Sequence, residues 1–147
     1  MDNNRRAPDL DEDEVLRCVE KMAVILHELI REGYASDAIS GALNMRFIEM
    51  SNERAGKEPK PVDVRALFPT LGKNAWDQTD LCHGRMKTAT EALQGEGFST
   101  DAIMWSLIAA VKNLLRVSGA VTEEIEKIVG ELLHQFHEAR RPQVIYL

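Results

Sequence analysis

The residue types best suited to metal chemistry gather near the carboxyl end of this 147-residue chain. Glu131 and His134 form the pattern E-x-x-H, and His137 follows one turn later. On a helix this spacing resembles half of a carboxylate-bridged metal site, which needs a second such motif on a facing helix. The other histidines, His27 and His83, have no glutamate three residues before them. We therefore predict no metal ligand here and interpret these side chains as lying at the edge of a helical core.

Two cysteines are the candidates for nucleophilic or redox chemistry. His83 directly follows Cys82, but neighbours on a helix point about 100° apart, so the two do not form a dyad. We interpret Cys18 and Cys82 as small buried hydrophobic residues, with a redox pair as the lesser alternative. The nucleotide patterns GxxxxGK[ST] and GxGxxG are absent from the sequence. The sequence predicts no catalytic residue, no cofactor and no enzymatic activity.

A likeness between two stretches of the chain points to duplicated elements. When the chain is shifted by 64 positions, nine of the 26 residues of 18–43 are identical to those of 82–107, without gaps. The densest matches lie in "EGYASDAI" and "EGFSTDAI". We interpret the pair as an internal repeat, with convergence on one helix–turn–helix geometry as the alternative.

Each copy contains the signals that end one helix and begin the next. A glycine can adopt the left-handed conformation that closes a helix, an aromatic residue fills the space after it, and a hydroxyl residue is suited to the N-cap of the next helix. An aspartate then lies in the first turn, where the helix dipole favours it. The predicted turn residues are Gly33, Tyr34 and Ser36 in the first copy and Gly97, Phe98 and Thr100 in the second.

These signals predict an all-α bundle of about five helices in one domain spanning 1–147, built from two related helical hairpins plus a C-terminal helix. The first repeat covers about 10–56 and the second about 76–118, joined by a connection at 57–75 and followed by a helix at about 122–141 with Thr122 as its N-cap. The first helix should begin after Asp9 or Asp11. Its apolar seam comprises Val15, Val19, Met22, Leu26 and Leu29, widened by Leu16, Ala23 and Ile30.

Charge and composition limit the function. The net charge is −6, which disfavours nucleic-acid binding, because that affinity comes largely from Lys and Arg. A helix–turn–helix regulator remains an alternative, although we expect Asp37 and Asp101 to lie exposed at the two helix entries, where they would repel phosphate. The sequence contains no stretch of about 18 apolar residues, so we predict no membrane span. The charged first residues do not resemble a secretory signal, so we expect a cytoplasmic protein.

The segment "AIMWSLIAAVKNLL" is apolar on nearly every side and therefore belongs in the middle of a bundle or in an interface. We predict a non-enzymatic interaction or regulatory protein, most simply a homodimer. Candidate interface residues are Met104, Trp105, Ile108 and Tyr146. The competing hypotheses are the helix–turn–helix regulator and a helical protein that binds a metal or a small ligand.

Overall fold

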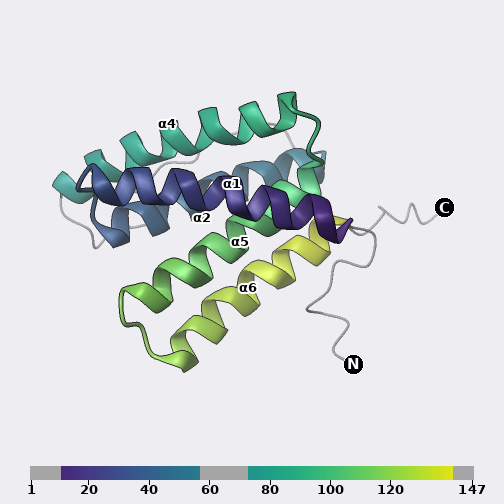
Figure 1. Cartoon of the computed structure of the whole chain (residues 1–147). Helices are drawn as coiled ribbons and strands as arrows, with labels where there is room; N and C mark the ends of the chain where they lie inside the picture. Colours follow the sequence, from purple (N-terminus) through teal and green to yellow (C-terminus); the bar gives the residue numbers. More distant parts are fainter. Residues whose placement is uncertain (1–10, 57–72, 141–147) are drawn as a thin grey trace.

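The structure is a computed structural model that describes residues 11–56 and 73–140. These residues form five helices packed as a bundle, with no strand among them, which confirms the predicted all-α fold (Figure 1). The helices are α1 (Glu12–Arg31), α2 (Ser36–Arg54), α4 (Lys73–Gly95), α5 (Thr100–Val117) and α6 (Thr122–Arg140). In the part of the chain described, no helix is long and apolar enough to cross a membrane.

Helix α1 begins where its acidic residues favour a helix start. The Asp11 side chain caps it by accepting a hydrogen bond from the backbone N–H of Asp13 at 2.9 Å. Met22, Leu26 and Leu29 are buried, as the predicted seam requires. The seam is narrower than predicted, because Leu16 is 58% exposed: it lies at the side of the helix, about a third of a turn from the buried face.

The glycine turns have the predicted geometry. Gly33 and Gly97 adopt positive φ angles of 92° and 100°. The N–H of Gly33 donates to the carbonyl of Ile30, and the N–H of Tyr34 donates to that of Leu29 at 3.3 Å. The second turn repeats this pattern, since the N–H of Phe98 donates to the carbonyl of Leu93 at 3.1 Å. Both are Schellman motifs, which satisfy carbonyl groups at a helix end.

The predicted N-caps are wrong by one residue. Ser36, Thr100 and Thr122 are each the first residue of a helix. Ser99 caps α5, because its hydroxyl accepts a hydrogen bond from the N–H of Ala102 at 3.2 Å. Ala35 stands at the same place before α2, has no capping side chain and makes no such bond. Ser99 and Thr100 are adjacent hydroxyl residues, and only the first of them caps the helix.

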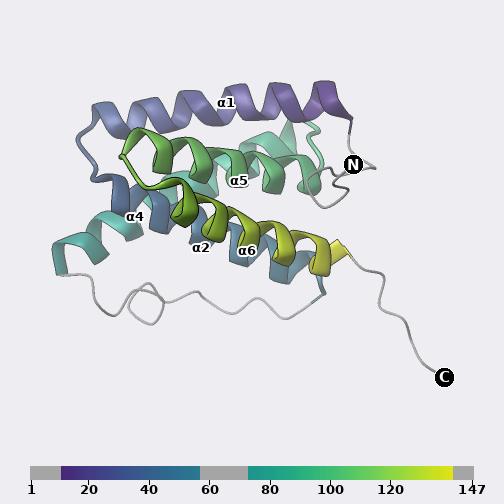
Figure 2. The same cartoon turned by 90° about the horizontal axis from the view of Figure 1, so that it is seen from below.

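The α1–α2 hairpin and the α4–α5 hairpin pack mainly on each other. Helix α1 lies against α5, and α2 lies against α4 and α5, whereas α1 touches α2 only slightly. Figure 2 shows α1 and α5 side by side with α2 and α4 on the far side of them. The core therefore forms between the hairpins, from residues such as Leu29, Phe47, Met86 and Leu107.

Two hydrogen bonds between the hairpins have matching positions. The Glu14 carboxylate of α1 accepts from the backbone N–H of Ser99 at 2.7 Å. The Gln78 side-chain oxygen of α4 accepts from the backbone N–H of Ala35 at 3.1 Å. Residues 14 and 78 are 64 positions apart, and so are 35 and 99. Each hairpin therefore supports the helix entry of the other in the same way.

Two ion pairs show the same correspondence. Lys21 and Glu96 approach to 3.4 Å, and Arg85 and Glu32 approach to 2.7 Å. Position 85 again lies 64 residues after 21, and 96 lies 64 after 32. Both pairs are about half exposed, so each contributes at most about 1 kcal/mol. The two ion pairs matter for comparing the two halves of the bundle, because residues 64 positions apart have equivalent neighbours.

Candidate interaction groove

Helix α5 is the central element of the bundle. It packs on α1 and α2 along one side and on α6 along another. Its high apolar content follows from this position, since buried residues recur on most of its circumference. The sequence predicted that this segment lies either in the middle of a bundle or in an interface. In the structure of the single chain, α5 lies in the middle of the bundle.

Three residues that were expected on the outer face of α5 are buried in the structure. Met104 is 0% exposed and Ile108 is 4% exposed, so both belong to the core of the chain. Asp101 is also buried, and its carboxylate lies 2.7 Å from the Arg54 guanidinium at the end of α2. Helices α6 and α2 both pack on α5, and periodicity alone does not show which neighbour covers each side of a helix. Trp105 stays half-buried, and Tyr146 lies outside the described residues.

Helices α5 and α6 run antiparallel and enclose a groove of about 540 Å³ between them. Both views show the two helices side by side (Figures 1 and 2). The α5 wall consists of residues three, four and seven apart, which share one helix face: Trp105, Ile108, Ala109, Lys112 and Arg116. Only Ile108 of these is fully buried, so this wall is apolar at depth and basic at its rim.

The α6 wall follows the same helical spacing. It consists of Ile125, Glu126, Val129, Gly130 and Leu133, and Ala120 and Thr122 close the groove at the turn. Gly130 adds no side chain, and a Cβ placed there would meet nothing within 4 Å. The groove is therefore open at the glycine of α6. Its floor is apolar, and among the described residues Glu126 is its only acidic lining residue.

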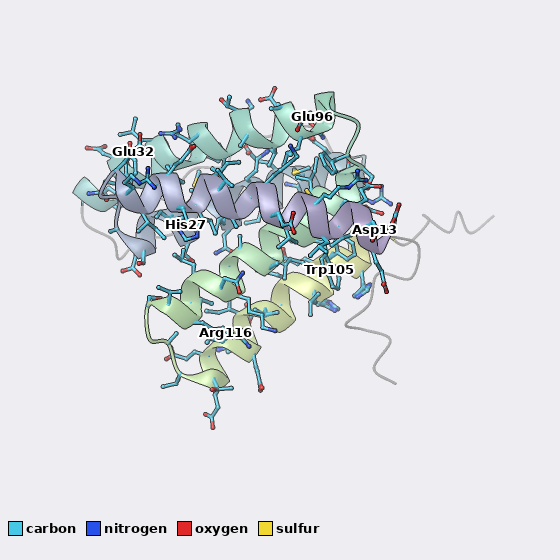
Figure 3. The ribbon with its side chains drawn as sticks, in the orientation of Figure 1. Asp13, His27, Glu32, Glu96, Trp105 and Arg116 are labelled. Atoms are coloured by element: carbon cyan, nitrogen blue, oxygen red, sulfur yellow. The ribbon has the colours of Figure 1, made fainter. Side chains whose placement is uncertain are left out.

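Trp105 and Phe136 fix one end of the groove. Their rings meet edge to face with centroids 5.5 Å apart. Phe136 is fully buried, whereas Trp105 lines the groove and is labelled in Figure 3. The tryptophan thus has one edge anchored in the core and another part available to a ligand. Partly exposed tryptophans with such support are frequent among the residues that dominate binding energy.

The charged groups on the groove rim have no ion pair among the described residues. The ion pairs of the described residues join α1 or its C-cap with α4 or the turn after it, α2 with α4, and α2 with α5, and one lies within α2. Lys112 and Arg116 on α5 and Glu126 on α6 take part in none of them. At the turn beside this rim, Val117 is 81% exposed and Val121 is 61% exposed. This end of the α5–α6 hairpin therefore presents unpaired charges and apolar side chains together.

The residues considered for metal binding do not form a cluster. Glu131 and His134 are exposed on α6, and His137 is partly buried with its ring 5.5 Å from that of Phe136. Among the described residues, no three His, Cys, Asp or Glu side chains are placed to hold a metal ion. His27 is exposed on α1 (Figure 3).

The two cysteines lie in the core, as interpreted, and neither forms a disulfide. The Cys18 thiol lies 3.4 Å from the Ser106 hydroxyl, and Ser106 in turn donates to the carbonyl of Ile103 at 2.6 Å. Burial raises the pKa of both thiols, that of Cys82 to about 11. Both thiols are therefore protonated at neutral pH and have low reactivity.

A buried polar cluster between α2 and α4 was not anticipated. Arg46 is 3% exposed, and its Nε donates to the Thr90 hydroxyl at 2.7 Å. Its Nη1 lies 3.4 Å from the Glu49 carboxylate, which also lies 2.6 Å from Nε2 of His83. The available signal was an arginine in the middle of the apolar stretch "GALNMRFIEM". Because the cluster is enclosed by protein, it has the character of a specific helix–helix contact rather than of a substrate site.

No protein-family model matches this chain, and no curated protein or solved structure matches it either.

Proposed function

We propose that the protein is a non-enzymatic interaction or regulatory protein of the cytoplasm that binds a helix of a protein partner in the α5–α6 groove. The observation that carries this proposal is the apolar floor of the groove beneath a charged rim. Helices bind in such grooves through apolar residues at positions i, i+3 or i+4, and i+7. Trp105 and Leu133 would contact these residues at one end of the groove, with Ile108 and Val129 further along it.

The location in the cytoplasm is supported by the thiols. Cys18 and Cys82 are both free and buried. Unpaired thiols are usual in reducing compartments.

We also propose that the α1–α2 and α4–α5 hairpins descend from one duplicated unit. The support is that the bonds between the hairpins recur at positions 64 residues apart, including both supported helix entries and both ion pairs. Duplication explains why α5 has gained apolar residues relative to α2: the second copy is followed by α6, which covers it.

A photo-crosslinker tests the groove directly. Benzoylphenylalanine replaces Ala109, which lines the groove, or Thr88, which is exposed on α4 and serves as control. Irradiation in cells should yield a protein adduct from position 109 and little from position 88, with the crosslinked peptide mapped by mass spectrometry to a helix-forming segment. Equal labelling from both positions, or none from 109, would refute a docking role for the groove.

A matched pair of substitutions complements the crosslinking. Trp105→Asp places a charge in the groove, whereas Leu81→Asp places the same charge at a residue of α4 that is 60% exposed. Only the first should reduce the mass of the complex in sedimentation, with helix content by circular dichroism unchanged in both. If Trp105→Asp retains fold, mass and adduct, the assignment of the interface is wrong.

A small apolar ligand is the second candidate, because about 540 Å³ lies within the range of about 300–1,000 Å³ usual for ligand sites. Native mass spectrometry of the freshly purified protein tests it. A discrete added mass that disappears on denaturation would favour the ligand over a protein partner.

A further inference from the structure

We infer that the partner at the α5–α6 groove is a second copy of this chain, whose own α5–α6 face packs against this one across a two-fold axis parallel to the two helices. This inference rests on the proposed function, since it names the partner of the same groove. It is carried by the juxtaposition of unpaired rim charges and exposed valines at one end of the groove.

The charges are self-complementary across the two walls. The α5 rim is basic at Lys112 and Arg116, and the α6 rim is acidic at Glu126. A two-fold contact brings each surface patch against its own copy, so it is favourable only if the patch contains both partners of each attraction. A patch with cations on one helix and an anion on the other meets this condition.

The positions of these charges select one two-fold arrangement. Lys112, Arg116 and Glu126 all lie in the half of the hairpin that adjoins the 118–121 turn. A two-fold axis perpendicular to the helices would place this half against the opposite half of the partner, so the charges would not meet. An axis parallel to the helices places α5 on the partner subunit's α6, turn beside turn. Lys112 and Arg116 then lie over Glu126 of the partner subunit.

The same arrangement brings the exposed valines to the edge of the contact. Val117 and Val121 flank the turn, at 81% and 61% exposure, and neither lines the groove. With the two turns adjacent, both valines lie beside the partner subunit's turn. Two α5–α6 hairpins then form an antiparallel four-helix arrangement, in which helix pairs usually cross at about 20°. Trp105 lies in the other half of this interface, where it extends the apolar contact.

Charge reversal with mixing tests the inference. Variant one is Lys112→Glu with Arg116→Glu, and variant two is Glu126→Lys. Each alone places like charges opposite one another at both symmetry-related contacts. In a mixture of the two variants, both contacts regain opposite charges. Sedimentation velocity and native mass spectrometry measure dimerisation of the full chain, with Lys87→Glu and Glu91→Lys on the exposed face of α4 as controls.

We expect the wild-type protein to be a dimer and each variant to dimerise about tenfold more weakly, with larger effects at low salt. The equimolar mixture should form the heterodimer with near wild-type affinity, and the controls should behave as wild type. A wild-type protein that is monomeric at 100 µM (about the highest practical concentration), variants that dimerise normally, or a mixture without heterodimer would each overturn the inference.

The dimerisation and crosslinking experiments distinguish an error about the identity of the partner from an error about the role of the groove. If the wild type is monomeric but Ala109 still crosslinks to another protein, the groove is a docking site for that protein and only self-association is wrong. If no adduct forms from position 109 at all, the proposed function itself fails.

Discussion

The buried polar side chains between α2 and α4 are matched to specific neighbours. Arg46 illustrates this, because its guanidinium is nearly inaccessible to water yet bonds to Thr90 and approaches Glu49. Removing one member of such a cluster leaves the others without their counterpart, and the cost is greater than the net value of the contact itself.

Replacing Glu49 by Gln should reduce the free energy of unfolding by about 1–3 kcal/mol, since the amide keeps the shape and removes the charge beside Arg46 and His83. The control is Glu53→Gln, at an exposed residue of the same helix, which should change it by less than about 0.5 kcal/mol. Urea denaturation at pH 7 measures both. Equal stability of the two variants would contradict the proposed importance of the cluster.

The thiols should react only when the core opens. Both cysteines are buried and protonated at neutral pH, so a thiol reagent in excess should modify the native protein far more slowly than the urea-unfolded protein. Rapid modification of either cysteine without denaturant would show that the core is not closed as described.

The same thiols predict the direction of an alkaline effect. The folded pKa of Cys82 is about 11, above the ordinary value of 9.0, so the unfolded chain loses this proton at lower pH. The contribution of protonated Cys82 to the free energy of unfolding is complete below pH 9. It falls by on the order of 2 kcal/mol as the pH rises from 9 to 11. Urea midpoints at pH 8 and pH 10.5 measure the loss, which Cys82→Ala should reduce.

At the scale of helices and turns, much of the fold could be predicted because the signals are local. The α1 seam from Met22 to Leu29 and the positive φ at Gly33 and Gly97 follow from periodicity and backbone sterics. The N-cap of α2 could not be predicted in the same way. Ala35 has no capping oxygen, and its N–H binds Gln78, a residue 43 positions away.

The candidate site was harder to predict than the helices. Trp105 is half-buried rather than fully exposed, and whether Met104 and Ile108 lie in the core depends on where α6 and α2 pack. Periodicity shows that a helix is apolar on several sides and does not show which neighbour covers each side. The groove itself requires two helices in a defined register, which no local pattern encodes.

Two glycine replacements of opposite sign test the turn geometry. Gly97→Ala places a side chain at φ 100° and should reduce the free energy of unfolding by about 1–2 kcal/mol. Gly84→Ala lies within α4, where a Cβ meets nothing within 4 Å, and should raise it by up to about 1 kcal/mol. Chemical denaturation measures both, and a stabilising Gly97→Ala would contradict the left-handed conformation.

At the scale of the whole molecule, the packing between hairpins predicts one cooperative unit. Trp76 lies on α4 and Trp105 on α5, so the variants Trp76→Phe and Trp105→Phe each leave one fluorescent reporter in a different part of the bundle. Both reporters should give the same urea midpoint, after correction for the stability change of each variant measured by circular dichroism, as expected for a single domain of this size. Separate midpoints would show that α4 and α5 unfold independently.

The reciprocal packing of α1 on α5 and of α4 on α2 also bears on how such a chain could have arisen. A gene encoding one hairpin alone would have made a product with its apolar side open to water. Two molecules of that product would have had to associate before either could bury its apolar face, so folding would have depended on protein concentration. Joining two such genes end to end would have freed folding from that dependence, and would have let the second half acquire α6 without altering the first.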